Sequence, residues 1–171
     1  MIDRSRIFKL LSIFTFIIVF FSACHVYTFR DVSIPAEVKT IKILYFDNKA
    51  RYINPQLSPR LTDQFTQKVT NLTKLTKTNN DDAHWIVAGT ITGYNVSTAS
   101  ISGQASVTNR LTVTVHIVFT DTVNNKTREE DVSRDFDFSA NLSLNQAEAT
   151  LTDRIVRNLS DEIFNRIFSN W

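Results

Sequence analysis

A run of strict alternation is the feature of this sequence that most constrains its fold. Between residues 111 and 120, apolar side chains alternate with mostly polar ones, as in a β-strand with one buried and one open face. Residues 123–126 (VNNK) then predict a hairpin turn, and residues 129–138 return with acidic and apolar side chains on opposite parities. We therefore expect an antiparallel hairpin with one polar face. The apolar positions of its first strand are Leu111, Val113, Val115, Ile117 and Phe119.

Further strands and helices follow from local patterns. Residues 40–46 (TIKILYF) predict a first strand, a short Thr-rich strand is expected after Asn71, and residues 85–96 predict an apolar strand. Gly89 and Gly93 within that strand allow a bulge or the close packing of another element. Residues 99–106 are small and predict a mobile loop.

Two amphipathic helices are expected. Ser58 as the cap and Pro59 in the first helical position predict the start of one helix, which should end near Asn71. Asn145 and Glu148 resemble a capping box that opens a long C-terminal helix. The first helix carries an apolar stripe at Leu61, Phe65, Val69 and Leu72, and the second carries one at Ala147, Leu151, Ile155, Leu159, Ile163 and Ile167. Together, the expected strands and helices predict an α+β two-layer sandwich, in which two helices pack on one face of a mixed, mostly antiparallel sheet.

The N-terminus predicts export and lipidation. Three cations among residues 1–9 precede an apolar run at residues 10–21, which is too short to span a bilayer as a helix and instead resembles a signal-peptide core. Residues 21–24 (FSAC) then look like a bacterial lipobox, with Cys24 as the lipidated residue. We expect a signal peptide at residues 1–23, a lipidated tether at residues 24–38 and a single domain at residues 39–171.

Removal of the signal peptide changes the charge balance. Lys plus Arg falls from 19 to 16 and Asp plus Glu from 17 to 16, so the mature chain is formally neutral. A neutral domain does not support nucleic-acid binding. With its single cysteine lipidated, the domain has no disulfide and depends on its core for stability.

No motif predicts catalysis. With three glycines, the chain carries no phosphate-binding loop, and the GxSxG, HExxH and CxxC motifs are absent from the sequence. His84 near Asp81 and Asp82 is better explained by a turn before a strand than by a metal site. We expect no enzyme, no metal and no cofactor beyond the lipid on Cys24.

Several short segments together carry a family resemblance. They are Cys24-x-x-Tyr27-x-Phe29, Ser33-Ile34-Pro35, residues 39–46 (KTIKILYF), residues 54–58 (NPQLS) and residues 108–113 (TNRLTV). This set resembles the LptE-like lipopolysaccharide-assembly lipoproteins, in the form found in Bacteroidetes. The resemblance implies a lipoprotein on the inner leaflet of the outer membrane that sits inside the LptD β-barrel, helps it fold and interacts with lipopolysaccharide.

The residues suggest where such contacts would lie. The polar strand face of Thr112, Thr114, His116 and Thr120 would suit a polar barrel lumen, although it would suit water equally well. Arg110 is a candidate contact for a lipopolysaccharide phosphate, with Lys39 and Lys42 as weaker candidates; a surface arginine over the sheet edge is the alternative explanation.

Two further possibilities follow from the sequence. Asp121-Thr122-Val123 resembles an O-glycosylation tripeptide of Bacteroidetes, which makes Thr122 a possible modification site. The alternative to a barrel partner is a periplasm-facing lipoprotein that scaffolds or regulates another cell-envelope enzyme or complex.

Overall fold

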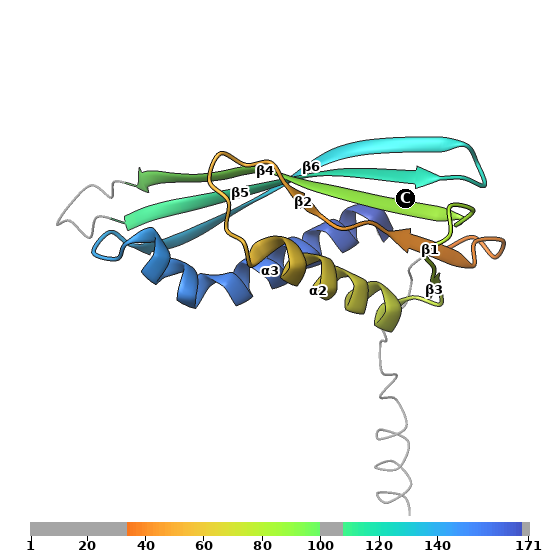
Figure 1. The fold of residues 1–171 in the computed structure, drawn as a ribbon, viewed down its shortest axis with the longest axis horizontal. Coiled ribbons are helices and arrows are strands. Elements are labelled where there is room, and N and C mark those ends of the chain that lie inside the picture. Colours follow the sequence, from red (N-terminus) through yellow and green to blue (C-terminus); the bar gives the residue numbers. More distant parts are fainter. Residues whose placement is uncertain (1–33, 100–107, 169–171) are drawn as a thin grey trace, which may run out of the picture. The chain divides into compact units, whose positions relative to one another are not determined.

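The computed structural model describes residues 34–99 and 108–168 (Figure 1). Within them, helices α2 (Leu57–Leu72) and α3 (Leu144–Phe168) lie on the same side of a six-stranded sheet. The predicted α+β two-layer architecture is therefore confirmed. The predicted signal peptide, Cys24, most of the tether and most of the loop predicted at residues 99–106 lie outside the described residues.

The sheet is mixed, and its three long strands are antiparallel neighbours. Its order is β3 (Thr76–Lys77), β1 (Thr40–Ile43), β4 (Trp85–Ala99), β5 (Thr108–Asp121) and β6 (Lys126–Ser139). β1 and the two-residue β2 (Asp47–Asn48) pair with β4 in parallel, one after the other along its length. The pairs β4–β5 and β5–β6 are antiparallel, and the second of them is the predicted hairpin.

The β5–β6 hairpin forms where the alternation predicts it. Its strands pair from Asp121 opposite Lys126 outward, and Asn125 adopts a φ of 50° in the turn. The Asp121 carboxylate accepts a hydrogen bond from the backbone N–H of Asn124 at 3.1 Å, which stabilises the turn. All five predicted apolar positions of β5 are buried, so the alternation assigns the two faces correctly.

The core lies between the sheet and the two helices. Leu61, Phe65 and Val69 of α2 are buried as predicted, whereas Leu72 is 43% exposed at the end of the helix, so its assignment to the stripe was wrong. The buried ring of Trp85 packs against the rings of Phe119 and Phe168, with centroids 5.1 and 5.9 Å away. The apolar stripe of α3 is also buried, at Ala147, Leu151, Ile155, Leu159, Ile163 and Ile167.

Both glycines of β4 have the structural roles expected of them. A Cβ on Gly89 would lie 2.8 Å from ring atoms of Phe46, so only a glycine lets this ring pack flat on the strand. The register of β4 against β5 shifts between Ile91 and Gly93. This bulge changes the parity of the strand, so that Ile91 and Tyr94 both face the core.

The first strand is shorter than predicted. β1 ends at Ile43, and the chain then turns Phe46 rather than Tyr45 into the core, which leaves Tyr45 56% exposed. The Phe46 N–H donates to the Thr62 hydroxyl of α2 at 3.1 Å, and the Phe46 ring lies 5.6 Å from that of Phe65. Packing of Phe46 against α2 breaks the strand where local alternation predicted that it would continue.

The start of α2 also differs from the prediction. The helix begins at Leu57, and Ser58 is buried inside its first turn, where its hydroxyl has no hydrogen-bond partner among the described residues. The Asn54 side chain instead accepts from the Gln56 N–H at 2.9 Å and turns the chain into the helix. Pro59 falls in the first turn, where its missing N–H costs no helical hydrogen bond.

The capping box of α3 lies two residues before the predicted one. The Ser143 hydroxyl accepts from the Gln146 N–H at 3.3 Å, and the Gln146 side chain accepts from the Ser143 N–H at 2.9 Å. Asn145 and Glu148 have the predicted spacing but are used elsewhere, because both receive a hydrogen bond from Tyr52.

Candidate functional site

The candidate site is the face of the sheet opposite the two helices. No helix within the described residues covers this face (Figure 1). The predicted partner-face residues lie on it in one row along β5, and each contacts a polar side chain of β6. The four pairs are Thr112 with Asp135 (2.7 Å), Thr114 with Ser133 (3.1 Å), His116 with Asp131 (2.9 Å) and Thr120 with Thr127 (3.5 Å). We call these pairs the polar ladder.

The β6 side of the polar ladder is acidic. His116 lies between two carboxylates, with its Nδ1 2.9 Å from Asp131 and its Nε2 3.5 Å from Glu129. Asp135 and Asp137 lie further along β6 on the same face of the sheet as Asp131, and Arg110 of β5 is the cation that faces them. Side chains paired in this way present a fixed pattern of hydroxyl, imidazole and carboxylate groups to whatever covers the sheet.

Arg110 is held at the end of the ladder by Asp137. Its Nε and Nη2 donate to the two carboxylate oxygens of Asp137 at 2.7 and 3.1 Å, and its Nη1 lies 3.9 Å from Asp135. The hydrogen bonds from Arg110 lower the pKa of Asp137, and they raise the pKa of the guanidinium. Both side chains remain nearly half exposed, so this is a solvent-accessible ion pair.

The sequence did not point to a second arginine beside Arg110. A depression of about 480 Å³ is lined by Arg110, Arg154, Asn158 and the β6 residues 135–137. Arg154 reaches it from α3, with its guanidinium 5.8 Å from the centre of the Phe136 ring and 3.3 Å from the Asp137 carbonyl oxygen. No local pattern could have found this pairing, because it depends on how α3 crosses β6.

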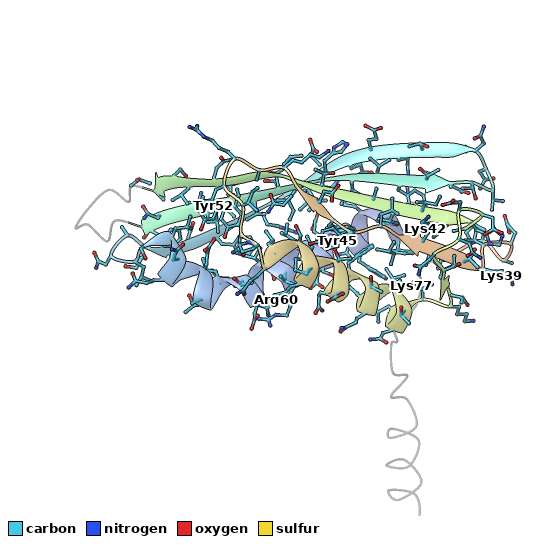
Figure 2. All side chains as sticks on the ribbon, viewed as in Figure 1. Lys39, Lys42, Tyr45, Tyr52, Arg60 and Lys77 are labelled. Carbon is cyan, nitrogen blue, oxygen red and sulfur yellow. The ribbon has the colours of Figure 1, made fainter. Side chains whose placement is uncertain are left out.

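Lys39 and Lys42 do not join Arg110 in one site. Lys42 of β1 is paired with Ile86 of β4, and Ile86 is in turn paired with Thr120 of β5. Arg110 lies at the other end of β5, where it is paired with Ser97 of β4. Thr120 and Arg110 are ten residues apart along β5, which corresponds to roughly 33 Å. Figure 2 labels Lys39 and Lys42 near β1, where Lys42 pairs with Asp81 at 2.6 Å. The hydrogen bond from Lys42 lowers the pKa of Asp81.

His84 and Thr122 have structural contacts next to these lysines. His84 Nδ1 accepts hydrogen bonds from the backbone N–H groups of Lys39 (2.9 Å) and Thr40 (3.3 Å), so this nitrogen carries no proton. The Thr122 hydroxyl donates to the carbonyl oxygens of Ala83 and His84, both at 2.9 Å. An O-linked sugar on Thr122 would remove that donor, and the modification stays a prediction.

A second polar cluster joins the loop before α2 to the start of α3. The hydroxyl of the buried Tyr94 donates to Glu148 at 2.6 Å, and that of Tyr52 donates to Glu148 at 3.3 Å and to Asn145 at 3.1 Å. The two tyrosine rings are stacked, with centroids 5.3 Å apart. No local pattern in the sequence indicates this cluster, which links residues 54 positions apart.

Raising the pH above about 10, where a free tyrosine ionises, is expected to destabilise the fold through Tyr94. Burial first, and then the hydrogen bond to Glu148, raise the pKa of the Tyr94 hydroxyl. The folded chain therefore keeps this proton at a pH where the unfolded chain loses it, and unfolding becomes more favourable as the pH rises. Urea unfolding at about pH 9 and about pH 11 should show a smaller loss of stability in Tyr94→Phe than in the native protein.

The control for this prediction is Tyr45→Phe, which removes a hydroxyl from an exposed ring. It should leave the pH dependence of stability unchanged. Equal pH dependence in the native protein and in Tyr94→Phe would mean that Tyr94 ionises alike in the folded and unfolded states.

The described part of the chain contains no helix long and apolar enough to cross a membrane. Among the same residues, no group of three or more His, Cys, Asp or Glu side chains is arranged to hold a metal ion.

Three solved structures are similar to this chain at low sequence identity. Protein XCC0632 from Xanthomonas campestris is 9% identical, with a TM-score of 0.51 over 80% of this chain and 87% of that one. The hypothetical protein CT253 from Chlamydia trachomatis is 11% identical, with a TM-score of 0.48 over 77% and 99% of the two chains. Lipoprotein GNA1162 from Neisseria meningitidis is 12% identical, with a TM-score of 0.40 over 72% and 99%. The first of these likenesses supports the fold alone.

A family model gives a more specific assignment. No curated protein sequence matches the chain. A family model with the description "LptE: Lipopolysaccharide-assembly" matches residues 38–167. This range includes every strand and nearly all of both helices of the described part of the chain. The resemblance to the LptE-like family found in the sequence is confirmed, and the match supports a role in lipopolysaccharide assembly. The chain belongs to the LptE lipopolysaccharide-assembly family.

Proposed function

We propose that this protein is an outer-membrane lipoprotein, anchored by lipid on Cys24, that partners an LptD-type β-barrel in lipopolysaccharide assembly. The observation that carries the proposal is the polar ladder on the open face of the sheet. A barrel lumen wide enough to hold a domain is polar, so a domain seated in it needs a polar rather than an apolar contact surface. The ladder of Thr112, Thr114, His116 and Thr120 is such a surface, and its paired side chains are already ordered.

Lipopolysaccharide contact is proposed at the depression beside Arg110. The Arg110–Asp137 pair is solvent-exposed, and water screens exposed ion pairs, so the two side chains are held together only weakly. A lipid phosphate can therefore replace the carboxylate at little cost and accept the same two N–H groups. Arg154 lines the same depression and would add a second cation. Lys39 and Lys42 stay weaker candidates, since they would have to contact a different part of the lipid.

Copurification tests the partnership. The tagged, lipidated protein is purified from detergent-solubilised outer membrane, and the copurifying proteins are identified by mass spectrometry. An LptD-type barrel in one-to-one amount supports the proposal, whereas a different envelope protein in its place supports the alternative of a scaffold or regulator. The intact mass of the same sample should show lipid on Cys24, and it decides whether Thr122 carries a sugar.

A matched pair of variants tests the contact face. Thr114→Arg places a long cation in the middle of the polar ladder, and it should reduce recovery of the barrel roughly tenfold, which corresponds to about 1.4 kcal/mol of binding free energy. Thr70→Arg makes the same change on the exposed face of α2 and should leave recovery unchanged. Equal losses in both variants would exclude the open face as the contact surface.

Arg110→Ala tests the phosphate contact. The variant should bind lipopolysaccharide roughly tenfold more weakly, as expected for the loss of a bidentate, charge-assisted hydrogen-bond donor. Its stability should stay close to that of the native protein, because the ion pair that is lost is exposed. The control is Arg157→Ala, which removes an exposed cation from α3. Unchanged binding by Arg110→Ala would end the proposal for this residue.

A further inference from the structure

A second depression lies on the other flank of α3. Its volume is about 360 Å³, and its walls come from the loop before α2, from α2 and from the start of α3. Tyr52 and Gln56 contribute from the loop, Arg60 from α2, and Asn145 and Glu148 from α3. Figure 2 labels Tyr52 on that loop and Arg60 on the helix that follows. We call this depression the tyrosine groove.

Tyr52 forms a rigid platform in the tyrosine groove. Its ring is stacked on the buried ring of Tyr94, with an interplanar angle of 25°, and its hydroxyl donates to Asn145 and Glu148. The side chain is thus fixed at both ends, yet the residue remains 38% exposed. An aromatic ring held in this way offers contact area without a further loss of conformational entropy on binding.

Anchoring of the loop explains only part of the cluster. The buried residues Asn54 and Tyr94 suffice to fasten the loop, since Asn54 turns the chain into α2 and Tyr94 binds Glu148. The exposed side chains of Tyr52, Gln56 and Arg60 gather above them and line a concave surface. A structural role for the cluster does not require this second, outward layer.

The chemistry of the lining favours one class of ligand. Apart from the aromatic ring, the groove presents amides, a carboxylate and a guanidinium, which suits hydroxyl groups and does not suit an acyl chain. Arg60 is already paired with Asp153, and Glu148 adds a negative charge, so the groove has no excess of cations to attract a phosphate. A sugar ring has an apolar C–H face for a tyrosine and a rim of hydroxyls for amide and carboxylate groups.

We propose that the tyrosine groove binds a saccharide unit, with Tyr52 under the sugar ring and Asn145, Gln56 and Arg60 as hydrogen-bonding partners of its hydroxyls. The proposal deepens the proposed function, because in a lipopolysaccharide-assembly protein the saccharide is the sugar portion of that lipid. The groove and the Arg110 depression both use α3, at Glu148 and Arg154. Six residues of helix correspond to an axial rise of about 9 Å, and the two depressions lie on different flanks of the helix.

The test is a titration of the ¹⁵N-labelled, lipidated protein in detergent with dephosphorylated core oligosaccharide, followed by NMR. Removal of the phosphates makes the result independent of Arg110, and the use of the protein without the barrel makes it independent of that partner. Backbone amides of Gln56 and Ala149 should shift in a saturable way. No saturable shift at these amides, or shifts confined to the Arg110 depression, would overturn the saccharide site and leave the proposed function standing.

Variants at Tyr52 make the test specific. Tyr52→Ala should weaken oligosaccharide binding roughly tenfold, whereas Tyr52→Phe, which keeps the ring, should stay within about threefold of the native affinity. Tyr45→Ala removes a tyrosine that is 56% exposed and does not line the groove, and it should bind normally. Thermal unfolding of each variant confirms that it is folded. If Tyr52→Ala is folded and binds the oligosaccharide with native affinity, the Tyr52 ring does not serve as a platform for the sugar.

Discussion

Replacing Trp85 with alanine should lower the free energy of unfolding by about 4 kcal/mol, the largest effect expected of a single substitution in this protein. The residue is 1% exposed at the start of β4, and its ring packs edge-on against Phe119 and at a tilt against Phe168. Its removal deletes contacts that join the sheet to the C-terminal end of α3. Because the neighbouring rings are held by both layers, the cavity cannot collapse fully, and its cost adds to the lost burial.

Urea unfolding followed by circular dichroism measures this loss. Leu72→Ala is the control, since Leu72 is 43% exposed at the end of α2 and its truncation should change stability by less than about 1 kcal/mol. A loss below about 1.5 kcal/mol in Trp85→Ala would show that Phe119 and Phe168 close the cavity, contrary to the packing described for the rings.

Replacing Gly89 with alanine should destabilise the fold by about 2–3 kcal/mol, although the change adds only one methyl group. The new Cβ would lie 2.8 Å from three atoms of the Phe46 ring, which is closer than carbon atoms can approach. Phe46 is fully buried and packs against Phe65, so it cannot swing into solvent to make room. The small gain in β-propensity from glycine to alanine does not offset this overpacking.

Gly93→Ala provides a matched control in the same strand. There the nearest atoms are the Cβ and the hydroxyl of Thr114, both at 3.1 Å, so a shift of a few tenths of an ångström suffices. Thr114 lies on the open face, where it can move, and we expect a loss below about 1 kcal/mol. Equal losses in the two variants would mean that loss of glycine in the strand, and not contact with Phe46, determines the cost.

The sheet and its faces could be predicted because the responsible signal is local. Leu111 and Thr112 point to opposite sides of β5 as a consequence of backbone geometry, and the same alternation continues through the hairpin. The apolar spacing of α3 likewise placed its buried side before any contact was known. At Phe46 and Asn145, where the boundaries were wrong, a contact distant in the sequence had replaced the local preference. At Ser58 the boundary was wrong because the nearby Asn54 turns the chain into the helix.

The candidate site could be predicted as a set of residues but not as an arrangement. Sequence alone placed Thr112, Thr114 and His116 in a row, since they share one parity of one strand. It could not show that Arg110 lies in a depression with Arg154, or that Lys42 is roughly 33 Å from it, because those facts depend on strand register and on the path of α3. The tyrosine groove had no local signal, as its walls come from three separate segments.

Local patterns of residues were enough to predict the α+β class, the hairpin, the polar face of β5 and the family resemblance, since each pattern lies within a short segment. No such pattern shows which charges are paired, where the first strand breaks or which side chains line a depression; these depend on how the elements pack together. The physical reason is that a side chain's partner is set by packing across the two layers. Tyr94 and Glu148 are 54 residues apart and meet only when α3 docks against the sheet.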